Sequence, residues 1–208
     1  MKKIWLIFLN ITIVFNVMAL QFSEGNQYIS LDKPLTSNPQ ILEFFSFYCS
    51  HCYQFEQVYQ LSDNIKKMLP ANTKITRYHV NFLGSLGKPL TQAWAVAIAL
   101  SVEDKVSPLM FETIQKTQVV KTPDDIRNIF IKAGVNAVDY DAALNSFVVK
   151  YLVLQQEQAA ENLHLNSVPA VFVNGKYMIK NNGLDSSSMD VYVQQFSDVV
   201  KFLSQQSE

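Results

Sequence analysis

The chain has 208 residues, of which 49% are hydrophobic, and a formal net charge of −1 at pH 7. This length and composition favour one compact folded unit with a substantial core. No run of Lys or Arg interrupts the periodic segments, so the sequence lacks the electrostatic pattern of a nucleic-acid-binding protein.

Residues 1–19 have the composition of a secretory signal peptide. Two lysines precede a mostly apolar stretch, and small residues stand at its end, where signal peptidase cleaves. A membrane anchor is the alternative. However, a span needs roughly 20 predominantly apolar residues, and this shorter stretch contains Asn10, Thr12 and Asn16. We therefore expect cleavage of residues 1–19 and export of residues 20–208.

Cys49 and Cys52 are the two cysteines of the sequence. Small exported domains often use several disulfides as structural crosslinks. A bond between residues so close in the chain closes a very short loop, for which loop-entropy models predict the least stabilisation. A reactive pair therefore explains these cysteines better than a structural one.

The first predicted elements include a βαβ unit. A short strand is expected at 28–31, and the nearly continuous apolar run at 40–47 is typical of a buried central strand. Apolar residues then recur at helical spacing, which predicts one helix over about 49–69, directly after that strand. Alternating residues predict a further strand over 74–82.

From about 89 to 156 the pattern is helical throughout. Thr122 is a natural N-cap and Pro123 suits the first helical position, so a helix is predicted to begin there and to end at Gly134. We expect this helical block to interrupt the α/β core as an insertion at about 83–156.

The core resumes with two short predicted strands, at 168–173 and 176–179. Asn174-Gly175 joins them and is the strongest two-residue hairpin signal. A last amphipathic helix is expected over about 187–203. The order of these elements predicts an α/β fold, with a single sheet flanked by helices.

A C-x-x-C pair between a buried strand and a helix has a mechanistic interpretation. Cys49 lies where unpaired backbone N–H groups and the helix dipole favour a thiolate, so its pKa is expected to be lowered. His51 adds a donor or a positive charge near that sulfur. Cys52, one turn further on, is expected to be buried and to act as the resolving thiol. Stabilising the reduced form makes such a pair an oxidant.

A metal site is the alternative use of a C-x-x-C pair, because the pair supplies half of a zinc site. His51, His79 and His164 are the remaining candidates, and none has the spacing of a ligand pair. We therefore expect no metal, and interpret His79 and His164 as packed or surface residues.

Several segments together resemble the DsbA family of periplasmic thiol:disulfide oxidases. They are 42–49, 51–56 and 168–170 around the motif, and 91–97, 147–150 and 172–177 elsewhere. The resemblance implies a thioredoxin fold with an inserted helical domain. It also implies a monomer in the periplasm that donates its Cys49–Cys52 disulfide to reduced or unfolded exported polypeptides. A DsbB-like membrane oxidant would regenerate that disulfide, and no other cofactor is implied.

The resemblance also assigns residues around the disulfide. Pro169 is implied to be cis and to lie against the cysteines, which leaves the backbone of Val168 free to pair with a substrate strand. Met189 and Tyr192 match positions near the peptide groove and are candidate substrate contacts. Their alternative interpretation, as core residues, is favoured by composition.

Four further residues are candidates for tuning the sulfur pKa values. Ser50 stands where the family typically has Pro, so the oxidising strength is open while the reaction class is not. Glu43, in the middle of an apolar strand, and Glu56 are implied to modulate proton transfer. Arg77 replaces a Lys and does not lose its proton, which argues against a shuttle role. A structural ion pair is the alternative for Glu43, Glu56 and Arg77.

Two other functions remain open from the sequence. A disulfide reductase or isomerase would use the same cysteines at a lower potential, and such enzymes often carry a dimerisation segment, for which we expect no room before the first core strand. A peptide-binding chaperone would keep the disulfide for shape alone.

Overall fold

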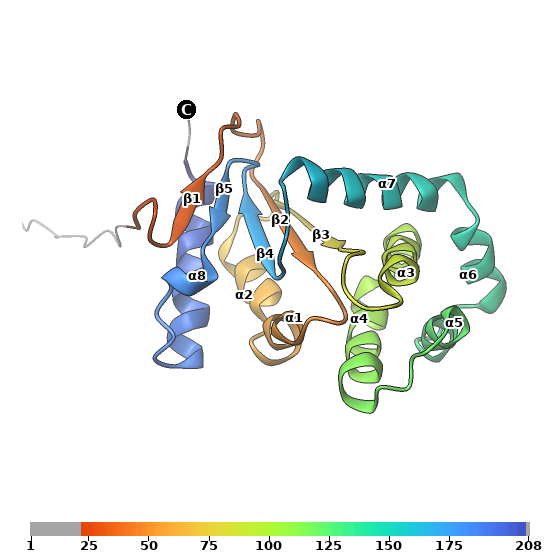
Figure 1. Ribbon diagram of the computed structural model, residues 1–208. Helices are drawn as coiled ribbons and strands as arrows, with labels where there is room; N and C mark the ends of the chain where they lie inside the picture. Colours follow the sequence, from red (N-terminus) through yellow and green to blue (C-terminus); the bar gives the residue numbers. More distant parts are fainter. Residues whose placement is uncertain (1–21, 207–208) are drawn as a thin grey trace, which may run out of the picture.

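The computed structural model describes residues 22–206 and contains a five-stranded sheet in the order β1-β5-β4-β2-β3 (Figure 1). β2 and β3 are parallel, and the other neighbouring pairs are antiparallel. The strands are β1 Tyr28–Ser30, β2 Gln40–Phe45, β3 Lys74–His79, β4 Ala170–Val173 and β5 Tyr177–Ile179. The predicted α/β fold and the parallel βαβ pairing are confirmed.

β2 is central because both of its faces are apolar. Phe44 and Phe45 are fully buried on opposite faces of the sheet. Ile41 belongs to the core under α2 (Leu61–Met68) and α8 (Met189–Ser204), whereas Phe44 packs with residues of α7 (Phe147–Asn162). Helices therefore cover both faces of the sheet, as Figure 1 shows.

The prediction of one continuous helix after the cysteine motif is wrong. The chain forms α1 (Ser50–Tyr53), a π-helical segment (Gln54–Val58) and then the separate helix α2. The break falls at Gln60, which adopts a left-handed conformation with φ of 48°. Helical periodicity in the apolar residues continues across this break, so the pattern alone does not reveal it.

The inserted helices lie beyond the β3 edge of the sheet (Figure 1). They are α3 Gly87–Leu100, α4 Glu103–Phe111, a π-helical segment at Glu112–Thr117, α5 Pro123–Lys132, α6 Ala137–Leu144 and α7. Thr122 is the N-cap of α5, as predicted, and Asp125 completes a capping box with it. Gly134 follows that helix with φ of 89°. α7 then leads back onto the sheet and ends at Asn162, beyond the predicted helical limit of about 156.

The C-terminal part of the fold follows the sequence pattern closely. Asn174 and Gly175 both have positive φ, 52° and 68°, as the predicted hairpin turn requires. Ser188 caps α8 by accepting a hydrogen bond from the backbone N–H of Val191. The predicted signal peptide, residues 1–19, lies outside the described residues. Between residues 22 and 206 no helix has the length and apolar character of a membrane span.

Candidate active site

Cys49 lies between the end of β2 and the start of α1, where it is the N-cap residue. Its backbone is extended, and its Sγ accepts a hydrogen bond of 3.1 Å from the backbone N–H of Cys52. A sulfur in this position replaces the oxygen that an N-cap side chain usually provides. The helix start therefore offers the sulfur donors that have no partner within the helix.

The pKa of Cys49 is lowered to about 7. Hydrogen bonding by the Cys52 thiol is the largest cause, burial acts against it, and the backbone N–H groups of Cys52 and His51 lower the pKa further. As a thiol, Cys49 donates to the carbonyl oxygen of Val168 at 3.4 Å. Ionisation removes that donor and leaves a thiolate held by the helix start.

Cys52 has the opposite surroundings, with only 1% of its surface exposed. Burial raises the pKa of Cys52, and the neighbouring Cys49 and the negative charge of Glu43 raise it further. Cys49 is half-buried, whereas Cys52 is buried. This asymmetry lets Cys49 react with an external sulfur while Cys52 stays protonated.

A groove of about 290 Å³ runs beside Cys49, and His51, Pro169, Met189 and Tyr192 line it. The Val168–Pro169 peptide bond is cis, as the resemblance implies. Met189 is 48% exposed, whereas Tyr192 also packs on Phe55, Tyr59 and Phe196. The groove wall thus combines core packing with open apolar surface.

The structure brings the predicted charged residues together behind Cys52. Arg77 Nη1 donates to Glu56 Oε1 at 2.8 Å, and Arg77 Nε lies 3.2 Å from Glu43 Oε2. Ser62 Oγ lies 3.0 Å from Glu43 and 3.1 Å from Glu56, between the two carboxylates. Burial raises the pKa of Glu56, partly offset by Arg77.

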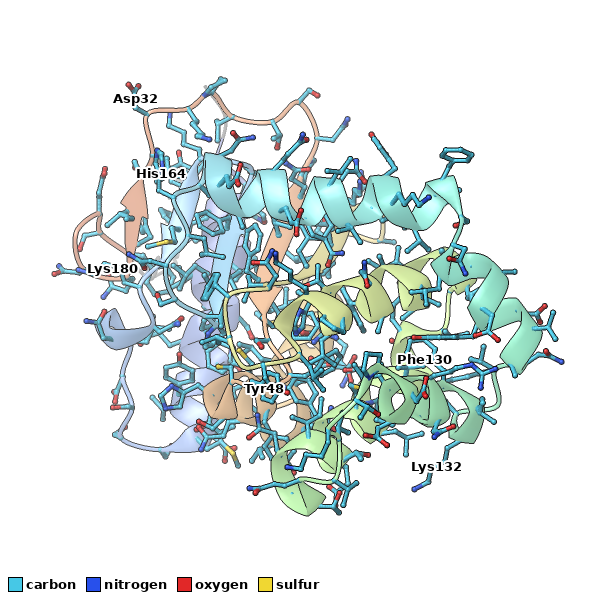
Figure 2. The ribbon with its side chains drawn as sticks, turned by 45° about the vertical axis from the view of Figure 1, so that its right-hand side comes forward. Asp32, Tyr48, Phe130, Lys132, His164 and Lys180 are labelled. Atoms are coloured by element: carbon cyan, nitrogen blue, oxygen red, sulfur yellow. The ribbon has the colours of Figure 1, made fainter. Side chains whose placement is uncertain are left out.

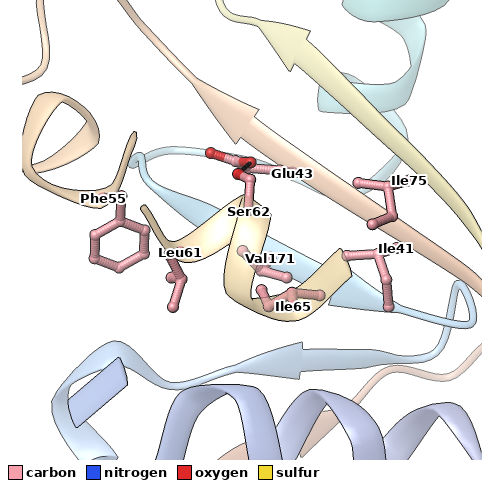
Figure 3. Close-up of a pocket in the computed structure, with 8 residues that line it drawn as sticks. All are labelled: Ile41, Glu43, Phe55, Leu61, Ser62, Ile65, Ile75 and Val171. Atoms are coloured by element: carbon pink, nitrogen blue, oxygen red, sulfur yellow. Dashed lines mark hydrogen bonds between the residues drawn. The ribbon is translucent and has the colours of Figure 1, made fainter. Parts of the chain in front are cut away.

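Figure 3 shows Glu43 and Ser62 pointing toward each other between α2 and the sheet. They line a cavity of about 10 Å³ whose other walls are apolar. Such a volume holds at most about one water molecule. The Glu43 carboxylate is therefore sealed from bulk solvent on this side, and its partners are Arg77 and Ser62.

Ser50 is exposed at the first position of α1. In the part of the chain that the structure describes, its hydroxyl makes no hydrogen bond to either sulfur. His164, also exposed, follows the end of α7 and adopts a left-handed conformation with φ of 49°.

His79 belongs to a buried polar network that the sequence did not reveal. Phe47 N–H donates to His79 Nε2 at 3.2 Å, so the neutral ring carries its proton on Nδ1, which donates to Thr91 Oγ1 at 2.9 Å. Gln156 accepts from the His79 backbone and donates to the Thr91 carbonyl. Burial lowers the pKa of His79 to about 3. The network thus stays uncharged and holds the backbone that leads to Cys49.

Gln115, in the π-helical segment of the inserted helices, is a second residue that sequence analysis missed. Its Nε2 donates to the Phe47 carbonyl at 2.7 Å. Both backbone polar groups of Phe47 are therefore held by side chains. Tyr48 follows at the junction between the sheet and the inserted helices (Figure 2). Hydrophobic periodicity does not distinguish a π-helical segment from an α-helix, and such segments often occur at functional sites.

Within residues 22–206, no three His, Cys, Asp or Glu side chains cluster as metal ligands do. The polar groups that the structure brings together at this site are the two sulfurs, the carboxylates behind them and the backbone carbonyl of Val168.

Comparisons with known proteins agree with this geometry. A family model described as a DSBA-like thioredoxin domain matches residues 40–197. The chain is 67% identical over 203 residues to the thiol:disulfide interchange protein DsbA of Yersinia pestis, with 98% of each chain covered. It is 66% identical over 203 residues to DsbA of Pectobacterium carotovorum, again covering 98% of each.

Solved structures give the same result. The structure of Proteus mirabilis DsbA, as a Cys-to-Ser variant with a non-covalently bound peptide PWATCDS, matches with a TM-score of 0.86 and 54% identity. That match covers 89% of this chain and 100% of the other. The match confirms the predicted thioredoxin fold with its inserted helical domain.

Proposed function

We propose, from the premise that the chain belongs to the DsbA family of thiol:disulfide interchange proteins, that it oxidises newly exported polypeptides with its Cys49–Cys52 disulfide in the periplasm. The asymmetry of the two thiols carries this proposal. Cys49 has a pKa of about 7 at a helix start, and Cys52 is buried with a raised pKa.

In the first step, a substrate thiolate attacks Sγ of Cys49 in the oxidised protein. The Cys49–Cys52 bond breaks, a Cys49–substrate mixed disulfide forms, and Cys52 leaves and takes up a proton. Attack at Cys49 is favoured because Cys52 is buried beneath it. The raised pKa of Cys52 keeps it protonated afterwards, which disfavours its immediate return to the mixed disulfide.

In the second step, another thiolate of the substrate attacks the substrate sulfur of the mixed disulfide. The substrate gains a disulfide, and Cys49 leaves as a thiolate. A low pKa makes Cys49 a good leaving group, so its helix-start position drives the reaction toward substrate oxidation. The two electrons remain on the reduced pair until a DsbB-like membrane oxidant removes them.

The groove beside Cys49 is the proposed binding site for the substrate. Within the described residues, the backbone N–H of Val168 makes no hydrogen bond, so it is available to an extended peptide. Met189 and Tyr192 provide apolar surface beside it, which suits unfolded chains of varied sequence. His51, exposed at the mouth of the groove, adds a donor near the reacting sulfur.

We assign the buried charged residues a role in proton supply and in sulfur energetics. The negative charge of Glu43 raises the pKa of Cys52, and burial raises the pKa of Glu56. A carboxyl group whose pKa is raised exchanges its proton more readily at neutral pH, which suits Glu56 to proton supply. Arg77 remains charged, so its contribution is to hold both carboxylates in place.

The test is disulfide transfer from the oxidised chain to a reduced peptide that contains two cysteines, followed by mass spectrometry. One peptide disulfide is expected per Cys49–Cys52 bond lost. Cys49→Ser abolishes transfer, and Cys52→Ser yields a mixed disulfide at Cys49. Transfer that survives Cys49→Ser overturns the proposal. An equilibrium that leaves the peptide reduced points to a reductase or isomerase instead.

A further inference from the structure

Asn181 begins a short 3-10 turn, Asn181–Gly183, between β5 and α8. Its Nδ2 donates to the carbonyl oxygen of Pro169 at 2.8 Å. A carbonyl accepts and never donates, so this contact fixes which end of the amide faces Pro169. The remaining atom, Oδ1, is buried and has no hydrogen-bond partner among the described residues.

The turn that carries Asn181 is fixed against the N-terminal part of the chain. The backbone N–H of Lys180 donates to the Gln27 carbonyl at 2.9 Å, and Lys180 Nζ donates to the Gly25 carbonyl. Gly183 packs so closely on Asn26 that a Cβ there would lie 1.9 Å from the Asn26 oxygen. Figure 2 shows Lys180 at this edge of the molecule. The position of Asn181 is therefore set by packed backbone.

The same side chain lines the groove beside Cys49, together with His51, Pro169 and Met189. The carbonyl that it holds belongs to the residue after Val168, whose own carbonyl lies 3.4 Å from Cys49 Sγ. A continuous set of contacts thus joins the N-terminal segment, the turn, the Val168–Pro169 loop and the reacting sulfur.

Burying an acceptor without a partner costs free energy. An apolar side chain of similar size would fill the same space without burying an unpaired acceptor. The amide of Asn181 is therefore better explained by the hydrogen bond that its Nδ2 donates to Pro169. That donor acts on the carbonyl of Pro169, which lines the groove and directly follows Val168, whose N–H is unpaired among the described residues. Holding a binding loop in one conformation before the ligand arrives improves affinity, because less ordering is left for the binding step.

We propose that Asn181 is a substrate-positioning residue, which holds the Val168–Pro169 backbone in the conformation that receives an extended cysteine-containing peptide. The inference rests on the proposed function and deepens it. Substrate affinity then depends partly on the turn before α8, whereas the reactivity of the Cys49 sulfur depends on the start of α1. The two should therefore respond to different substitutions.

Two variants of the full chain, Asn181→Ala and Asn181→Leu, test the proposal through kcat and KM for oxidation of a two-cysteine peptide. Both remove the donor to Pro169, and Leu keeps most of the volume. We expect KM to rise roughly three- to tenfold in both, the size of one lost hydrogen bond, with kcat within about twofold. The glutathione equilibrium should stay unchanged, because the donors to Cys49 Sγ are untouched.

Asn145→Ala is the matched control, because Asn145 Nδ2 also donates to a backbone carbonyl at 2.8 Å, that of Asp141, on an exposed surface. It should leave KM unchanged. Wild-type KM in both Asn181 variants overturns the proposal, and so does a KM that rises only in the Ala variant, since lost volume then explains it. A thermal midpoint that falls without any change in KM also overturns it. A wild-type chain that oxidises no peptide would instead overturn the proposed function.

Discussion

Arg77 and His79 lie two residues apart on β3, so their side chains leave the same face of the sheet, yet their buried surroundings differ. Arg77 is charged and lies between Glu43 and Glu56, with its Nη2 unpaired among the described residues. His79 is neutral, and both of its ring nitrogens have partners.

The Arg77 cluster affects the charge and pKa values at the site, whereas the His79 network affects the position of the backbone. The Glu43 carboxylate beside Arg77 acts on the buried sulfur, since its charge raises the pKa of Cys52. The network around His79 acts on the backbone before Cys49, because it holds the N–H of Phe47. A buried charge depends on its partner for its stability, whereas a satisfied neutral network depends on staying neutral.

Removing the cation from the Arg77 cluster should lower the unfolding free energy more than protonating His79 does. Arg77→Met leaves Glu43 and Glu56 buried without a cation, which we expect to cost about 3–5 kcal/mol of unfolding free energy at pH 7. Burial raises the pKa of Glu56, and a raised pKa favours the folded state at low pH and destabilises it as pH rises. The deficit should therefore shrink at pH 5. Urea unfolding at both pH values measures it.

Arg127 is the matched control for Arg77, since its Nε lies 2.7 Å from Asp141 Oδ1 on the surface. Arg127→Met should have a much smaller effect, because solvent screens an exposed pair. Equal losses for the two variants would show that burial of the Arg77 cluster has no energetic consequence.

Protonation of His79 should give the next largest loss of unfolding free energy. The folded-state pKa of His79 is about 3, below an ordinary value near 6.5, so the unfolded chain binds more protons between these values. Stability is therefore lost as pH falls through this window, at about 1.4 kcal/mol per pH unit, or roughly 2–3 kcal/mol at pH 4.5.

His79→Gln isolates this contribution, because Gln does not titrate and keeps an acceptor for Phe47 N–H, while His51 and His164 remain in both proteins. Urea unfolding from pH 7 to pH 4.5 should be less steep for the variant. Parallel pH profiles would mean that His79 is not held neutral in the folded state.

The sequence predicted the parts of the molecule that local patterns encode. The apolar run of β2, the N-cap at Thr122 and the Asn174-Gly175 turn each depend on neighbouring residues, and the structure confirms all three. The break at Gln60 was missed because its cause is a single left-handed residue within a continuous apolar period.

The site was predictable where chemistry has a short motif. Cys49 and Cys52 follow from spacing, and Glu43 stood out as an acid within an apolar strand. His79, Gln115 and Asn181 carry no such signal, because their partners are backbone groups far away in the sequence. Side chain to backbone bonds of this kind depend on the fold, so only the folded structure identifies them.

The central claim is that the two thiols differ, with Cys49 the reactive thiolate. The most direct test is alkylation of the reduced chain by iodoacetamide as a function of pH, with the modified residue located by mass spectrometry. We predict modification at Cys49 alone, with an apparent pKa of about 7. Modification of Cys52 at a comparable rate, or an apparent pKa for Cys49 near the ordinary value of about 8.5, would contradict the account.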